Sequence, residues 1–340
     1  MQLGVRGDIL VNTKKETNSN AKSNLALKYF SKIQTRNLGV FIGFIILCIF
    51  FGITTNNFFT VNNLLNVAMQ TSIIAIVAIG QTYVIIKAGI DLSVGSIVAI
   101  SGVIVAESLT YGLPIWLSVL LGIGVGVLCG LINGFIIAVG KVPPFIATLG
   151  MMSVARGIVF IITDGVPIAG LPREFNLIGG GKFLDIIPYP ILITIFLAII
   201  MGVVLKKSRF GRNVYAIGSN ESAAFLSGIR VVKTKIYVYA LSGLMSGIAG
   251  ILLTSRLVAA QPTAGEMYEL DAIAAVVIGG ASLMGGSGAI LGTMIGVLIM
   301  GVLRNGLNLL GISYFWQQVA IGIVIIIAVY FDTYKKNKKS

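Results

Sequence analysis

Acidic side chains occur in two apolar parts of this sequence, where a charge is costly and therefore informative. Asp91 lies in the stretch GIDLSVGS (89–96), and PTAGEMYELD contributes a second group, Glu266, Glu269 and Asp271. A charged side chain at the centre of a membrane costs about 2.5–3.5 kcal/mol on insertion scales. Such carboxylates can accept hydrogen bonds at a helix end, form a polar gate or path, or transfer protons.

Other kinds of chemistry are excluded by the residue types that the chain lacks. None of the 340 residues is a histidine, which excludes imidazole metal sites and His-based acid–base mechanisms. Cys48 and Cys129 lie in apolar runs, where buried thiols fit better than a disulfide. The phosphate-binding pattern GxxxxGKS/T does not occur, and GGGKFLD (179–185) has neither its spacing nor its hydroxyl residue. We therefore expect no metal site, no nucleotide site and no enzyme active site in this chain.

The composition defines the class of protein. Hydrophobic residues make up 56% of the chain and charged residues 11%, against roughly 25% charged residues in soluble domains. The 42 glycines fit membrane helices, which approach one another closely through small residues. We predict an all-α integral membrane protein. The net charge of +13 then reflects lysine and arginine held on the cytoplasmic side, and it indicates no nucleic-acid partner.

Apolar runs recur along the chain and predict a polytopic bundle of about ten transmembrane helices. They cover residues 38–54, 64–86, 93–109, 115–139, 144–163, 189–205, 235–255, 270–284, 288–303 and 315–331. Several are shorter than the ~20 residues of a perpendicular span, and runs 270–284 and 288–303 could be short, tilted or re-entrant. Glycines recur every fourth residue in the fourth run, which predicts close helix packing at Gly122, Gly126, Gly130 and Gly134.

The basic residues predict the orientation. With both termini in the cytoplasm, all but five of the 25 lysines and arginines fall in inside segments. The chain then divides into a polar cytoplasmic tail (1–36), a transmembrane domain (37–332) and a basic cytoplasmic tail (333–340). The longest cytoplasmic loop covers residues 206–235. No small-residue cleavage site follows the first apolar run, so we interpret it as an uncleaved span.

This loop contains a short predicted helix. Asn220 or Ser219 can cap its start, Glu221 complements its positive end, and Gly228 ends it. A short amphipathic helix lying along the membrane is a good docking element for a partner protein. An ordinary connecting helix that contacts nothing fits the pattern equally well.

For the two acidic groups, structural and functional interpretations both remain open. Asp91 can cap the helix that begins near Ser93, or it can belong to a gate or path. No second carboxylate lies beside it in the sequence to form a proton relay. The later cluster can complement the dipole of the helix it opens, or it can contact an external partner. Candidates for the gate or path are Asp91, Ser93, Gly95, Asn305 and Asn308, and candidates for the external contact are Arg256, Gln261, Glu266, Glu269 and Asp271.

Several stretches together resemble one family. GRNVYAIGSNESAAFLSGI resembles the loop through which permeases of ABC importers contact their ATPase subunits, in the form found in monosaccharide importers, with Ser222 between the glutamate and two alanines. GIDLSVGS, AQPTAGEMYELDAIAAVVIGG and NGLNLLGISYFWQQV resemble further signatures of these permeases, and the last two look most like ribose permeases. The resemblance implies an ATPase-coupling role for Asn220, Glu221, Ala223, Ala224 and Gly228.

The resemblance also implies partners. These are a second copy of the permease, a separate ATPase subunit that holds ATP and Mg, and a soluble or lipid-anchored sugar-binding protein outside the bacterial cytoplasmic (inner) membrane. The chain itself would carry no cofactor and would import a monosaccharide, with ribose as the first candidate. Alternatives are a permease for another pentose or an autoinducer-like sugar derivative, and an ion-coupled secondary sugar transporter. Two features favour the ABC importer over the secondary transporter. The cytoplasmic loop 206–235 is structured, and we expect the chain to lack paired intramembrane charges that could couple transport to ions.

Overall fold

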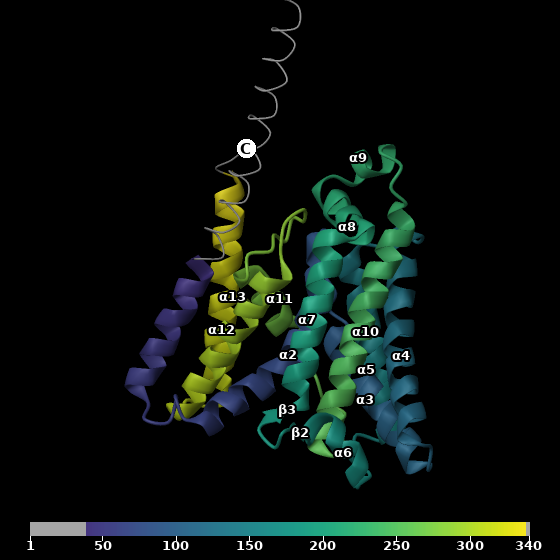
Figure 1. Ribbon diagram of the computed structural model, residues 1–340. Helices are drawn as coiled ribbons and strands as arrows, with labels where there is room; N and C mark the ends of the chain where they lie inside the picture. The colour runs from purple at the N-terminus through teal and green to yellow at the C-terminus, as the bar shows by residue number, and fades with distance from the viewer. Residues whose placement is uncertain (1–38, 338–340) are drawn as a thin grey trace, which may run out of the picture.

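The computed structural model describes residues 39–337 as a bundle of long helices (Figure 1). Each predicted apolar run coincides with a helix. In chain order these are Gly39–Thr54, α2 (Val61–Ile86), α3 (Val94–Thr110), α4 (Ile115–Ala138), α5 (Pro144–Thr163), α7 (Tyr189–Lys207), α10 (Val231–Leu257), α11 (Tyr268–Ile278), α12 (Ile290–Leu309) and α13 (Tyr314–Asn337). Six of them are long and apolar enough to cross a membrane, namely α2, α4, α5, α7, α10 and α12. The predicted tail 1–36 lies outside the described residues, and α13 continues into the predicted tail that begins at residue 333.

The remaining elements are short and lie at the two ends of the bundle. At one end, α8 (Arg209–Ser219) and α9 (Glu221–Leu226) fill the predicted loop, and α9 projects beyond the neighbouring helices (Figure 1). At the other end, α6 (Arg173–Gly180) lies beside two small antiparallel pairs. β1 (Ile168–Ala169) pairs with β4 (Ala259–Ala260), and β2 (Lys182–Phe183) pairs with β3 (Ile187–Pro188). The all-α prediction therefore holds apart from these two-residue strands.

Among the six long helices, α2 and α10 are the most buried. In the most apolar 18-residue stretch of each helix, 83% of the residues of α2 and 61% of those of α10 are buried, whereas only 17% are buried in α5 and in α7. Large apolar side chains such as Phe135, Phe145 and Phe196 point outward instead. A soluble protein would not expose so much apolar surface, and this pattern fits helices that face lipid or another membrane subunit.

The predicted glycine stripe on α4 packs against α10. A Cβ atom added at Gly126 would lie 2.6 Å from the carbonyl oxygen of Gly243, and one added at Gly134 would lie 2.7 Å from Cα of Ile236. These distances are shorter than real Cβ contacts, so the backbone of α10 approaches α4 at positions where α4 has no side chain. The predicted packing role of the stripe is confirmed.

Two non-helical segments enter the bundle from opposite ends. Residues 87–93 follow α2 at the α9 end, and residues 261–267 follow β4 at the other end. The second segment meets the first turn of α3, because Gly265 and Gly95 lie so close that a Cβ atom on either would clash with the other's carbonyl oxygen. Gly265 has a φ of 72°, which a larger residue rarely adopts. The helices α3 and α11 therefore both start inside the bundle.

The run 270–284 contains the shortest of these helices. α11 has 11 residues and is only about 16 Å long, roughly half the thickness of a membrane core. It ends at Ile278, and a turn with positive φ at Gly280, Gly285 and Gly286 follows. The run 270–284 is therefore short, which is one of the predicted alternatives, whereas 288–303 corresponds to the full-length helix α12.

Candidate functional site

The helix α9 is built as its sequence predicts. Asn220, not Ser219, is the cap, and its side-chain oxygen accepts a hydrogen bond from the Ala223 amide at 2.9 Å. Glu221 in the first turn forms an ion pair of 2.7 Å with Lys235 on α10. Gly228 has a φ of 81° and follows the last turn, where its amide donates to Phe225. All three residues therefore define the shape and anchoring of α9.

The outer side of α9 carries exposed apolar side chains. Ala224 is buried against Ile217 and Val231, while Phe225 is 68% exposed and Leu226 is 84% exposed. The helix α9 projects from the end of the bundle (Figure 1). The two exposed side chains therefore form a small apolar tip. Such a tip is suited to contact with another protein.

The neighbouring helix α8 fixes α9 to the centre of the molecule. The Tyr215 hydroxyl donates a hydrogen bond of 2.7 Å to the Gly288 carbonyl, and Gly218 packs against the last turn of α2 at Ile86. The Ile86 carbonyl in turn accepts from the Gly286 amide at 2.8 Å. A displacement of α8 and α9 would therefore act on the end of α2 and on the turn after α11.

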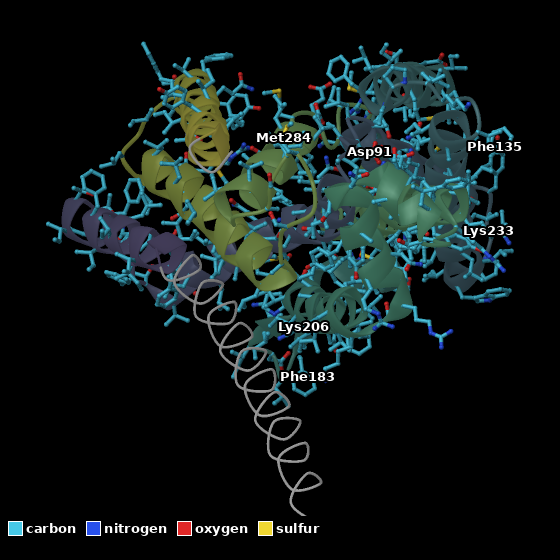
Figure 2. The ribbon with its side chains drawn as sticks, turned by 90° about the horizontal axis from the view of Figure 1, so that it is seen from above. Asp91, Phe135, Phe183, Lys206, Lys233 and Met284 are labelled. Carbon is cyan, nitrogen blue, oxygen red and sulfur yellow. The ribbon has the colours of Figure 1, made fainter. Side chains whose placement is uncertain are left out.

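Asp91 is the centre of a buried hydrogen-bond network. One carboxylate oxygen accepts from the Ser93 amide at 3.0 Å and from the Ser93 hydroxyl at 2.6 Å, and the other accepts from the Ser242 hydroxyl at 2.8 Å. Asn133 donates to the Ser93 hydroxyl at 2.9 Å. Asp91 is 0% exposed and lies within the bundle in Figure 2, whereas Phe135 lies on its outer edge. The network joins the start of α3 to α4 and α10.

This geometry corrects the predicted capping role. The cap position of α3 is Ser93 and not Asp91, and the Ser93 side chain makes no capping bond to the helix. Asp91 instead bonds to the residue two positions later and to a different helix. Ser242 lies 11 residues after the start of α10, so the carboxylate sits about 16 Å from that end of the helix.

A second polar cluster holds the other entering segment. Arg156 on α5 donates to the carbonyls of Pro262 and Ala264 at 2.6 and 2.9 Å. The carboxylate of Glu269 lies against Gly95, only 2.5 Å from where a Cβ atom would stand. The guanidinium thus fixes the backbone of residues 262–264, and the glutamate lies where the two segments meet. No role was predicted for Arg156 from the sequence, although an arginine within an apolar run is itself a signal of function.

Asp271 does not lie on the surface. It is 2% exposed, and both of its oxygens accept from the Arg304 guanidinium on α12 at 2.8 Å. A buried carboxylate with a partner is not free to contact an external protein, so that prediction is wrong. The expectation that the chain lacks paired intramembrane charges is also wrong. Asp271 and Arg304 are 33 positions apart in the sequence, so only the fold brings them together. Gln261 and Glu266 are exposed, while Arg256 and Glu269 are half-buried.

The predicted gate residues do not form one group. Ser93 and Gly95 lie beside Asp91, but Asn305 exchanges two hydrogen bonds of 2.9–3.0 Å with Asn63, at the opposite end of α2. Asn308 is exposed. A reciprocal amide pair satisfies both side chains, so Asn305 ties α12 to α2 and lies far from the Asp91 network.

Lys87 is a buried basic residue for which the sequence predicted no role. Its ammonium lies 3.2 Å from the Tyr239 hydroxyl and 4.3 Å from the centre of the same ring. Burial, and after it the charge of Lys235, lowers the pKa of Lys87 to about 7. Lys87 and Asp91 thus contact α10 one turn apart.

The fold defines a membrane transport protein, because apolar helices enclose polar segments that enter from both ends. The chain belongs to the family described as "Branched-chain amino acid transport system / permease component", whose model matches residues 63–329. It is a permease subunit of an ABC transporter in the bacterial cytoplasmic membrane, and not an enzyme.

Curated relatives are similar over nearly their whole length. The chain is 51% identical to the ribose import permease protein RbsC of Bacillus subtilis over 302 residues, which cover 88% of this chain and 94% of the relative. It is 50% identical over 303 residues to the protein of that name from Haemophilus influenzae, with the same coverage. The L-arabinose transport system permease protein AraH of Escherichia coli is 42% identical over 301 residues, covering 88% of this chain and 92% of the relative. No solved structure matches the chain.

Proposed function

We propose that this chain is the transmembrane subunit of an ABC importer for a monosaccharide, and that the sugar is ribose. The observation that carries the proposal is the 51% identity to a ribose import permease over 94% of that relative. Identity to the arabinose permease of Escherichia coli is 42%, against 44% for the ribose import permease of the same organism, so the preference for ribose rests on the relatives at 50–51%. The family description names amino acids, but the relatives compared here are named for sugars.

The proposed topology has about ten membrane helices and both termini in the cytoplasm. Six helices are long enough to cross the membrane. The helix Gly39–Thr54, α3, the apolar part of α13 and the short α11 complete the set of ten. The positive charge of the chain gathers at the end that carries α8 and α9, which supports a cytoplasmic position for that end. The domain boundaries at residues 37 and 332 remain part of this proposal.

The ATPase subunit, which would bind ATP and Mg, docks on α9. Asn220 and Glu221 fix the start of this helix, Ala223 and Ala224 build its body, and Gly228 ends it. The exposed tip of Phe225 and Leu226 supplies the apolar contact. Without a nucleotide-binding motif of its own, the chain depends on this partner for ATP-driven transport.

The sugar-binding protein docks at the opposite end, where Gln261 and Glu266 are exposed and Arg256 is half-buried. From there the sugar passes the segment held by Arg156 and Glu269 and then the segment of Asp91, Ser93 and Gly95. These two segments block the bundle where they touch, so they must separate during transport. A second permease copy covers part of the apolar surface of α5 and α7, which are the least buried spans.

Competition for uptake tests the substrate. Proteoliposomes containing the permease, its ATPase and its binding protein are supplied with labelled ribose and ATP. We expect unlabelled ribose to compete, and xylose, arabinose and leucine to compete far less. Equal competition by arabinose would replace the proposed sugar, and competition by leucine would replace the proposed substrate class.

One observation favours a second candidate, an ion-coupled secondary transporter. The Asp271–Arg304 pair is an intramembrane charge pair of the kind that such transporters use. Uptake that this chain drives alone with an ion gradient would establish this alternative.

A further inference from the structure

A cavity of about 870 Å³ opens beside α9, at the end of the bundle that the proposed topology places in the cytoplasm. Its walls come from α9, from the first turn of α10 and from the turn between α4 and α5 (141–144), and Lys87 contributes to its lining at the end of α2. The volume holds several side chains, which is far more than a single inorganic ion needs.

The cavity carries an excess of positive charge. Three lysines line it, Lys87, Lys141 and Lys235, against one carboxylate, Glu221. Glu221 is already paired with Lys235 at 2.7 Å. The other two lysines are Lys141, which is exposed, and Lys87, which is 4% exposed and whose ammonium form an approaching anion would stabilise.

Lys87 lacks a contacting anion within the part of the chain that the structure describes. The hydrogen bond it has goes to the neutral Tyr239 hydroxyl, and no described carboxylate lies within 4.0 Å of its ammonium. Asp91 is near in sequence, but its oxygens accept from Ser93 and Ser242. Burying an ammonium group without an anion is expensive. A lysine in that state beside a cavity is suited to receive a carboxylate.

The rest of the lining is apolar. Ile137, Pro143 and Pro144 form one side, and Phe225 and Leu226, the exposed tip of α9, form the rim. An occupant that fits both parts of the lining carries carboxylates together with apolar side chains. Since the rim is the same α9 surface on which the ATPase is proposed to dock, the occupant belongs to that protein.

We propose that the cavity receives an acidic segment of the ATPase subunit, whose carboxylates reach Lys141 and Lys87 while its apolar side chains cover Phe225. The contact adds a charged anchor to the apolar docking of α9, and it brings the partner to the end of the entering segment 87–93. This inference rests on the proposed function, because it requires an ATPase partner.

Charge reversal tests the anchor through the Kd between the reconstituted permease and the ATPase. Lys141→Glu is expected to raise that Kd about tenfold or more and to weaken its dependence on salt. Lys207→Glu is the matched control, since Lys207 is exposed at the same end but does not line the cavity. Its Kd should stay within about twofold of the wild type. Lys87→Gln should also raise the Kd. If this buried variant fails to fold, the Lys141→Glu variant still tests the proposal, because Lys141 is exposed.

Zero-length cross-linking locates the contact. A carbodiimide joins a carboxylate to a lysine amine only when the two touch, and mass spectrometry then identifies the joined peptides. We expect an adduct between Lys141 or Lys87 and an acidic residue of the ATPase. Lys141→Arg keeps the charge but offers no reactive amine, so it should keep the affinity and lose the Lys141 adduct.

The two proposals fail separately. If the wild-type permease binds no ATPase, the proposed function itself is wrong. If the wild type binds, but Lys141→Glu binds equally well and no adduct forms at Lys141 or Lys87, only the cavity proposal is overturned. An anionic lipid that co-purifies with the wild type and is lost from Lys141→Glu, with ATPase affinity unchanged, would overturn it too.

Discussion

Asp91 holds its position through hydrogen bonds more than through an opposite charge. Its two oxygens accept three hydrogen bonds from Ser93 and Ser242, and Ser93 is held in turn by Asn133. A carboxylate with several donors is stable where an isolated one is not. The residue therefore acts first as a structural junction between α3, α4 and α10, at the point where the chain enters the bundle.

Substitution of Asp91 separates hydrogen bonding from charge. Asp91→Asn keeps an oxygen for the Ser93 amide and an amide group for Ser242, so we expect a near-normal apparent Tm in detergent. Asp91→Ala leaves buried donors without an acceptor, at about 1–3 kcal/mol each, and should lower the Tm clearly. ATP-driven uptake by the asparagine variant should also persist. Loss of uptake in a well-folded Asn variant would mean that the charge itself takes part in gating.

The Asp271–Arg304 pair predicts strong coupling in a double-mutant cycle. Arg304→Gln alone leaves the buried Asp271 carboxylate without its partner and should reduce the free energy of unfolding by about 3–5 kcal/mol, whereas Asp271→Asn leaves the 30% exposed Arg304 side chain unpaired and should cost less. The double variant should lose much less than the sum. The exposed pair Glu221–Lys235 is the control, and its coupling should stay below roughly 1 kcal/mol. Additive single effects at Asp271 and Arg304 would show that the pair does not hold α11.

Among the elements, α9 is the one whose geometry follows from local signals. Asn220 and Gly228 are capping and stopping residues that act within a few positions, and both behave as predicted. The apolar runs also predicted the helices well. By contrast, the sequence left open whether the run 270–284 forms a short helix, and α11 ends early, at Ile278. A glycine-rich apolar sequence does not reveal where a helix ends inside a bundle.

Long-range partners are what the sequence did not reveal. Asp91 bonds to a serine 151 positions away, and Asn305 bonds to an asparagine 242 positions away. Asp271 looked like a surface acid until α12 placed Arg304 beside it. Residue type and spacing along the chain carry no information about such pairs, whereas a lone arginine in an apolar run could have identified Arg156 as a candidate.

Substitution of Gly228 tests the docking role of α9. At a φ of 81° a bulky residue is strained, and a tryptophan there would alter the surface beside Phe225. Gly228→Trp should nearly abolish ATP-driven uptake while the protein remains in the membrane. Gly228→Asn, which tolerates this backbone conformation, should retain most of the activity. Normal uptake by the tryptophan variant would remove α9 from the docking surface.

The contact between α4 and α10 can be tested with two glycines of one helix. A Cβ atom at Gly130 would overlap the backbone of Tyr239, whereas Gly124 has nothing within 4 Å. Gly130→Ala should therefore lower stability by about 1–3 kcal/mol. Gly124→Ala should be neutral or slightly stabilising, since alanine favours helix. Equal effects of the two alanines on the apparent Tm would contradict the packing described here.

At the scale of the whole molecule, contacts connect the α9 end to the interior of the bundle. α8, which leads into α9, contacts the end of α2 and the turn after α11. From these two places the chain enters the bundle as segment 87–93 or continues as α12. The other entering segment meets the first turn of α3 where Gly265 lies against Gly95. In this account the ATPase moves α9, and the entering segments then separate to let the sugar pass.

The most direct test of this account is the energy source for uptake. Labelled ribose uptake is measured in proteoliposomes with the permease alone under an ion gradient, and with the permease, ATPase and binding protein with and without ATP. We predict uptake only in the complete system with ATP. Uptake by the permease alone, driven by the ion gradient, would contradict the account and would make the buried charges at Asp91 and Asp271 the first candidates for ion coupling.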